Sequence, residues 1–109
     1  MTEGDAIARL RAMCGGPRDG ALLRVSLANA LIAAGDRAAA IDELRRATEF
    51  DAGYSAAWKL LGRTLAESGD AKAAAAAYQR GIDAAIKHGD KQAEKEMRVF
   101  LKRLQRPRQ

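Results

Sequence analysis

The sequence predicts an all-α fold of about six helices, stacked as antiparallel pairs in a right-handed superhelix. Three observations support this prediction. Alanine, the strongest helix former, supplies 25 of the 109 residues, whereas β-branched and aromatic residues, which favour strands, are scarce. Two similar loops, Ala34-Gly35-Asp36 and Ser68-Gly69-Asp70, lie 34 residues apart. The flanking residues also match at this offset, small to small and large to large, and such a period is typical of helical repeats.

The first predicted helix covers residues 3–14 and corresponds to the second half of a helix pair. At the same offset its residues fall on those of a later helix: Ala6 on Ala40, Ile7 on Ile41 and Leu10 on Leu44. The segment Gly15-Gly16-Pro17 ends it. We therefore expect a single domain over residues 1–109 that opens with a half-repeat.

The first complete unit is predicted over residues 21–54, with helices at about 21–34 and 37–50. Its first helix carries small and large apolar residues at helical spacing, namely Leu23, Leu27, Ala30, Leu31 and Ala34. Gly35 can adopt the positive φ that ends a helix, and Asp36 is placed to cap the next one.

The second unit is predicted over residues 55–88, with helices at about 55–68 and 71–87. A further helix at 90–104 has one apolar stripe, formed by Ala93, Met97, Phe100, Leu101 and Leu104. This last helix does not match the start of a third unit. We expect it to cap the array, with its apolar side inward and Lys95, Arg98 and Lys102 in solvent.

The second unit resembles the tetratricopeptide repeat family, whose pattern is Trp, two residues, Leu-Gly, two residues, Tyr, then Ala, three residues, Phe, and later Pro. The corresponding residues here are Trp58, Leu61, Gly62, Leu65, Ala74 and Tyr78. The first unit matches less closely and has Arg24 at the tryptophan position. Neither unit has the closing proline, since Ala52 and Ile86 stand there.

Two glycines lie inside predicted helices of the second unit, although a glycine there costs about 1 kcal/mol relative to alanine. Close helix packing would offset this cost at Gly62 and Gly81. We expect Gly62 to lie against Ala74, with Trp58 and Tyr78 buried on either side.

No residue pattern indicates an enzyme, a cofactor site or a metal site. The chain has one histidine, His88, one cysteine, Cys14, and three serines, none of them in a nucleophile turn. No Cys/His cluster has zinc spacing, and the glycines at 15–16 are not part of a phosphate loop. With no signal-like or membrane-spanning apolar run, we expect a soluble cytoplasmic protein. Its excess of arginine over lysine, with its many alanines, points to a GC-rich bacterial genome.

The resemblance implies a non-enzymatic scaffold that binds another protein or a peptide. In that family the first helices of successive units line a concave groove. Carried over to this sequence, the groove residues are Leu22, Val25, Asn29, Ile32, Ala56, Lys59, Arg63 and Ala66. Asn29 matches an asparagine that clamps a ligand's carboxylate in some members, whereas Val25 replaces the accompanying lysine. The implied partner has both acidic and apolar character.

Two alternatives remain open. The net charge of +5 is concentrated in residues 71–109, where ten basic and four acidic side chains give +6. The end of the chain carries a run of basic residues with no acid among them, namely Arg98, Lys102, Arg103, Arg106 and Arg108. This end could bind nucleic acid or an acidic surface. Self-association through an incomplete end of the array is the other alternative.

Overall fold

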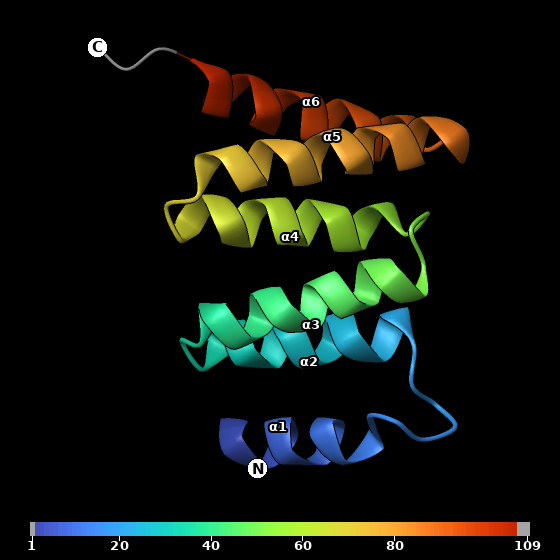
Figure 1. Cartoon of the computed structure of the whole chain (residues 1–109), viewed down its shortest axis with the longest axis vertical. Coiled ribbons are helices and arrows are strands. Elements are labelled where there is room, and N and C mark those ends of the chain that lie inside the picture. The colour runs from blue at the N-terminus through green and yellow to red at the C-terminus, as the bar shows by residue number, and fades with distance from the viewer. Residues whose placement is uncertain (1, 107–109) are drawn as a thin grey trace. The chain divides into compact units, whose positions relative to one another are not determined.

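The computed structural model describes residues 2–106, and over this range the chain forms six α-helices and no strand. The helices are α1 (Glu3–Met13), α2 (Ala21–Ala33), α3 (Arg37–Phe50), α4 (Ser55–Glu67), α5 (Ala71–Lys87) and α6 (Lys91–Gln105) (Figure 1). They belong to two compact units, Met1–Asp51 and Ala52–Gln109. The prediction of an all-α fold built from helix pairs is confirmed. Arg108, part of the predicted basic end, lies outside the described residues.

The glycine-aspartate loops end one helix and begin the next. Gly35 has a φ of 84°, and the N–H of Asp36 donates to the Leu31 carbonyl at 2.8 Å. The Asp36 side chain then accepts from the N–H of Ala39 at 3.1 Å and caps α3. The same arrangement recurs at Gly69-Asp70 and at Gly89-Asp90. The predicted helix breaks are therefore confirmed, and each has the expected physical cause.

In the first unit, α2 packs along α3, and α1 packs against α2. The buried side chains from this helix pair include Leu27, Leu31 and Leu44. Ala28, Ala40 and Ala47 are also fully buried, and these small side chains allow the helices to approach closely.

In the second unit, α5 packs against both α4 and α6 (Figure 1). Trp58 and Tyr78 are only 9% and 3% exposed, which confirms the predicted burial. The Trp58 indole N–H donates to the Ala52 carbonyl at 2.8 Å and so fixes the segment before α4. Buried tryptophan needs such a partner for its N–H group.

The two helix-interior glycines each face bulky side chains. A Cβ added at Gly62 would lie 2.7 Å from ring carbons of Tyr78, so this ring fills the space nearest to the glycine. The expected contact with Ala74 stays a prediction. The ring occupies the space because Tyr78 stands one helical turn beyond Ala74. A Cβ at Gly81 would collide with Met97 Sδ of α6 and would lie 2.8 Å from Trp58 Cβ of α4. Gly81 therefore marks the point at which three helices converge.

Helix α6 turns its apolar stripe toward α5, as predicted. Met97 is fully buried beside Tyr78, Ile82 and Ala85. Four other α6 residues pack against the same cluster, namely Ala93, Phe100, Leu101 and Leu104. The cations predicted to face solvent, Lys95, Arg98 and Lys102, are exposed. That this helix acts as a cap on the end of the array stays a prediction.

Candidate functional site

The candidate site in the second unit begins with two cations on α4. Because Trp58, Leu61 and Leu65 are buried against the core, Lys59 and Arg63 lie toward the outside of the helix. They are four residues apart and therefore share one face. The structure thus bears out the expected helical placement of these two side chains, whereas their role in binding stays a prediction.

Each of these cations is paired with a carboxylate of the chain itself. Lys59 Nζ lies 3.2 Å from Glu96 Oε1, and Glu96 belongs to α6. Arg63 Nε lies 3.3 Å from Glu67 Oε1, one turn along α4. All four side chains are at least partly exposed, so solvent screens both pairs. A ligand carboxylate would therefore compete with weak internal partners.

Aromatic side chains lie beneath these charges. The Tyr78 ring packs against Gly62 of α4, and its centroid is 5.7 Å from that of Phe100 on α6. Burial raises the pKa of the Tyr78 hydroxyl; nearby Arg63 opposes this effect and Glu67 adds to it. We call this region the α4–α6 face, formed by Lys59, Arg63, Glu67, Glu96 and Phe100.

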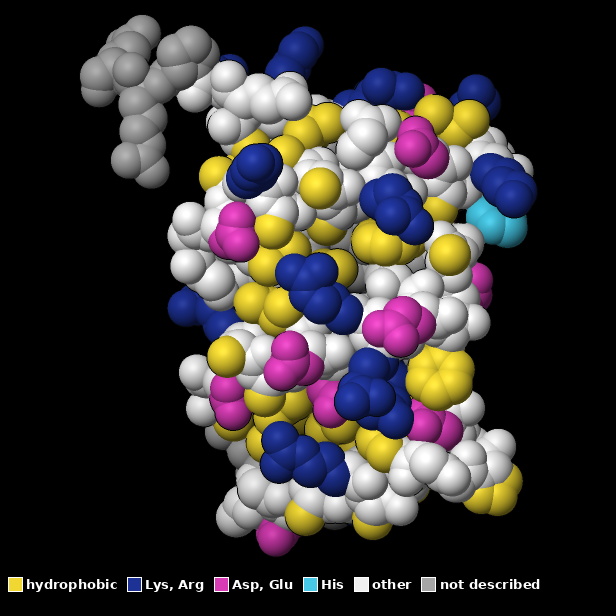
Figure 2. Space-filling view, in the orientation of Figure 1, with side chains coloured by type: hydrophobic (Ala, Val, Ile, Leu, Met, Phe, Trp, Pro, Cys, Tyr) yellow, Lys and Arg dark blue, Asp and Glu magenta, His cyan; other side chains and the backbone are white. Residues whose placement is uncertain are grey.

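The candidate residues of the first unit lie along α2. Leu22 is 70% exposed, Asn29 is exposed, and Val25 and Ile32 are half-buried. Their spacing places them on one face of the helix, away from the buried Leu27 and Leu31. On α4, the remaining groove candidates are Ala56, which is exposed, and Ala66, which is half-buried. Figure 2 shows positive and negative side chains interspersed with hydrophobic surface on the viewed side of each unit.

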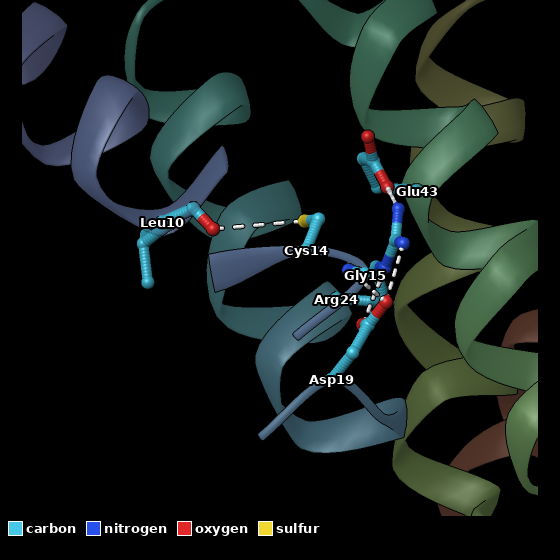
Figure 3. Close-up of polar contacts among 6 residues, drawn as sticks. All are labelled: Leu10, Cys14, Gly15, Asp19, Arg24 and Glu43. Atoms are coloured by element: carbon cyan, nitrogen blue, oxygen red, sulfur yellow. Dashed lines mark hydrogen bonds and ion pairs between the residues drawn. The ribbon is translucent and has the colours of Figure 1, made fainter. Parts of the chain in front are cut away.

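A buried ion cluster in the first unit was not anticipated from the sequence. Arg24 is bidentate to Asp19, with Nε–Oδ1 at 2.9 Å and Nη2–Oδ2 at 2.7 Å (Figure 3). Its Nη1 also contacts Glu43 Oε1 of α3 at 2.7 Å, and its guanidinium lies 5.8 Å from the Phe50 ring centroid. The available signal was Arg24 at the family's tryptophan position. A buried arginine requires carboxylates close by.

The cluster holds three segments of the first unit together. Hydrogen bonds from Arg24, and then one from the Gly15 N–H at 2.7 Å, hold the pKa of Asp19 well below its usual range. The same carboxylates raise the pKa of Arg24, Asp19 first and Glu43 second. Since Nε, Nη1 and Nη2 of Arg24 each donate to a carboxylate of the same unit, we assign the cluster a structural role.

Replacing Arg24 with methionine should lower Tm at pH 6 by roughly 10 °C, because two carboxylates lose their partner. The folded-state pKa of Asp19 lies below its unfolded value of about 3.9. The stabilisation that the Asp19–Arg24 pair gives the folded state is therefore fully present above about pH 4. It is lost as the pH falls through the folded-state pKa of Asp19. The difference in Tm between wild type and Arg24→Met should shrink between pH 6 and pH 3, as measured by circular dichroism.

The matched control is Arg45→Met, which removes an exposed arginine from α3. This variant should leave Tm nearly unchanged. A constant Tm difference between wild type and Arg24→Met across this pH range would contradict the proposed protonation effect.

The other chemically notable residues show no catalytic arrangement. Cys14 is a half-buried free thiol whose Sγ donates to the Leu10 carbonyl at 3.6 Å (Figure 3). His88 lies exposed at the C-terminal end of α5. Within residues 2–106, no group of three or more His, Cys, Asp or Glu side chains is placed to hold a metal ion. Over the same range, no helix combines the length and apolar character needed to cross a membrane.

Comparison with known proteins identifies the repeat. Residues 21–64 match the family model for the tetratricopeptide repeat. A TPR repeat-containing protein of Pseudomonas aeruginosa is 49% identical over 90 residues, which cover 83% of this chain and 86% of that protein. A Bordetella parapertussis protein with a known solution structure is 43% identical, with a TM-score of 0.75 over 90% of this chain and 85% of that one.

A more distant match has the same fold. The Sgt2 TPR domain from Aspergillus fumigatus is 26% identical, with a TM-score of 0.66 over 98% of this chain and 76% of that one. The helix pairs, the glycine-aspartate loops and the buried Trp58 and Tyr78 agree with these matches. The close sequence relationship to the Pseudomonas aeruginosa protein, over most of both chains, shows that this chain belongs to the tetratricopeptide repeat family.

Proposed function

We propose that this chain is a non-enzymatic scaffold that binds a peptide segment of another protein. The family is one of protein-interaction modules, which supports the general role. The observation that carries the specific proposal is the pair of cations on α4, Lys59 and Arg63, together with half-buried Phe100, which stands one helical turn beyond Glu96, the partner of Lys59. This mixture suits a peptide with a carboxylate next to an apolar side chain.

The internal ion pairs of Lys59 and Arg63 are weak enough for a ligand carboxylate to replace them. Exposed salt bridges stabilise a protein by only about 0–1 kcal/mol, so exchanging Glu96 or Glu67 for a ligand carboxylate costs little. A ligand carboxylate that meets Arg63 in bidentate geometry would form stronger bonds than the 3.3 Å contact between Arg63 Nε and Glu67 Oε1. We infer that Lys59 and Arg63 contribute charge-assisted hydrogen bonds and that Phe100 contributes apolar contact.

The exposed face of α2 offers a different kind of contact. Leu22, Val25 and Ile32 present apolar surface, and the Asn29 amide can donate to and accept from a peptide backbone. An exposed leucine alone is common on protein surfaces, but three apolar residues aligned with one amide suit a peptide. We propose that this face, within the first unit, contacts apolar side chains and the backbone of a peptide.

Alanine at both Lys59 and Arg63 should weaken binding of a peptide selected on the wild-type protein by about tenfold or more, because charge-assisted hydrogen bonds are lost. With so few contact residues, we expect a Kd of roughly micromolar or weaker for wild type. Ligands can be selected from a random peptide library displayed on phage and then titrated by calorimetry. The selected sequences should carry Asp or Glu beside an apolar residue.

The matched control is Lys72→Ala/Lys87→Ala, which removes two exposed lysines from α5. This double variant should bind the selected peptides as wild type does. A third variant, Glu96→Gln, removes the internal competitor of Lys59 and should tighten binding about two- to threefold. Equal affinity of wild type and Lys59→Ala/Arg63→Ala would exclude the α4–α6 face as the binding site.

A further inference from the structure

Helix α6 carries a row of cations on the side that faces away from α5. Four exposed cations recur at spacings of four, three and four residues and so share one side of the helix, namely Lys91, Lys95, Arg98 and Lys102. We call these four residues the basic row. Met97, on the other side of the helix, is fully buried against α5 and holds the row on a fixed element.

The carboxylates of α6 leave most of the charge of the basic row uncompensated. Glu94 Oε2 lies 2.9 Å from Arg98 Nε. Glu96 instead contacts Lys59 of α4. Within residues 2–106, the three lysines of the row form no salt bridge. The row therefore produces a positive potential along one side of the helix.

The solvent-exposed sides of other helices mix the two signs of charge. Helix α3 exposes Asp42 and Glu49 together with Arg45, and α5 exposes Asp83 together with Arg80. Mixed charges of this kind keep a protein soluble and favour no particular partner. A row that contains cations alone is instead suited to a ligand with many negative charges.

An open hollow lies among the cations of the basic row. Its lining residues are Lys95, Arg98, Val99, Leu101, Lys102 and Gln105. By helical spacing Val99 and Leu101 fall on opposite edges of the row, so the cations lie between them. The polar groups that line the hollow are thus two ammonium groups, a guanidinium and the Gln105 amide, all of which donate hydrogen bonds. A phosphate group, whose oxygens are anionic acceptors, matches these donors.

We propose that the basic row binds the phosphate backbone of a nucleic-acid duplex, independently of base sequence. From Lys91 to Lys102 the row extends about 16 Å along the helix axis. Over this length one strand of a duplex presents about five phosphates, because they recur about every 3.4 Å along its axis. The row contains neither Lys59 nor Arg63, so this proposal goes beyond the peptide site on the α4–α6 face.

The surroundings of the basic row favour a duplex over other polyanions. A segment of an acidic protein would bury apolar surface, and the row has none at its centre. A single strand gains affinity by stacking its bases on aromatic rings, but Phe100, the only aromatic residue of α6, packs against Tyr78. An anionic membrane would take up the apolar side of the helix, which is already packed against α5.

The test uses the full chain and a fluorescein-labelled DNA duplex of mixed sequence, and fluorescence anisotropy measures binding. We expect a Kd on the order of 10 μM at about 50 mM salt. With about four phosphate contacts, the logarithm of the binding constant should fall with the logarithm of the salt concentration with a slope of about −3 to −4. A duplex of different sequence should bind equally well, and a single strand of the same length should bind more weakly.

The variants locate the binding site. Lys95→Gln/Lys102→Gln should weaken duplex binding about tenfold or more at about 50 mM salt and make the salt slope shallower by about 2. Lys95→Arg/Lys102→Arg keeps both charges and should bind as wild type does. The matched control, Arg45→Gln/Arg46→Gln, removes the same charge from α3 and should leave binding nearly unchanged. Circular dichroism of each variant should match wild type, because all four altered positions are exposed.

Three results would overturn the proposal. The first is a loss of binding in Arg45→Gln/Arg46→Gln equal to that in Lys95→Gln/Lys102→Gln, which would show that overall charge is responsible. The second is binding of a polyglutamate peptide or of anionic phospholipid vesicles at least as tight as that of the duplex. The third is the absence of duplex binding at about 50 mM salt.

The peptide site can be tested separately from the basic row. Lys59→Ala/Arg63→Ala should leave duplex binding nearly unchanged, because both cations are already paired with carboxylates. Lys95→Gln/Lys102→Gln should bind the peptides selected on the wild-type protein as wild type does. Failure of the duplex proposal is therefore distinguishable from failure of the α4–α6 face.

Discussion

Replacing Gly81 with leucine should destabilise the fold by about 3 kcal/mol or more, at the upper end of typical overpacking effects. The added Cβ alone would lie 2.8 Å from Trp58 Cβ and would collide with Met97 Sδ. The flexible Met97 side chain could move away. Trp58 Cβ is attached directly to the α4 backbone, so only separation of α4 from α5 could relieve that contact. Urea unfolding followed by circular dichroism measures the effect.

A leucine at Gly62 should destabilise the fold less than a leucine at Gly81. Leucine at this position meets ring carbons of Tyr78 rather than a backbone-proximal atom, and a ring can tilt. We expect Gly62→Leu to cost about 1–3 kcal/mol, less than Gly81→Leu. The control is Ala76→Leu at an exposed position of α5, which should change stability by about 0.5 kcal/mol or less. Similar stability of Gly81→Leu and Ala76→Leu would show that the three helices do not converge tightly.

Most of the fold could be predicted because its determinants are local. The break at Gly35-Asp36 depends on a glycine with positive φ and a capping carboxylate, both readable from consecutive residues. Burial of Trp58 follows from helical periodicity within α4. At Gly62 the spacing indicates that α4 and α5 approach closely, but it does not show which side chain fills the space nearest to the glycine. Here the Tyr78 ring does.

The charges of the candidate sites could be predicted only in part. Lys59 and Arg63 share a helix face by spacing alone, but Glu96 comes 37 residues after Lys59 and meets it only because α6 packs back on α5 and α4. The link from Arg24 to Glu43 likewise joins two helices. Neither pair has a local sequence signal. Both pairs alter the charge available to a ligand, because each gives a carboxylate partner to a cation that has none nearby in the sequence.

Truncating the chain after Gly89 should have the largest effect of all and leave a protein that is unfolded or aggregated. The missing helix contributes Met97, which is fully buried, together with Phe100, Leu101 and Leu104, which pack against the same cluster. Burial of a large apolar side chain contributes about 1.5–3 kcal/mol, and domains of this size are stable by only about 5–15 kcal/mol. Losing four such contacts removes much of the total and exposes Tyr78 and Ile82 to solvent.

Sedimentation and circular dichroism of the truncated chain measure this outcome. The full-length variant Lys95→Gln/Lys102→Gln serves as the control, since it removes charge from α6 and keeps the inner packing. It should stay monomeric and as stable as wild type, which would assign the effect of truncation to the lost apolar contacts. A truncated chain that is monomeric and equally stable would instead mark α6 as an independent binding arm.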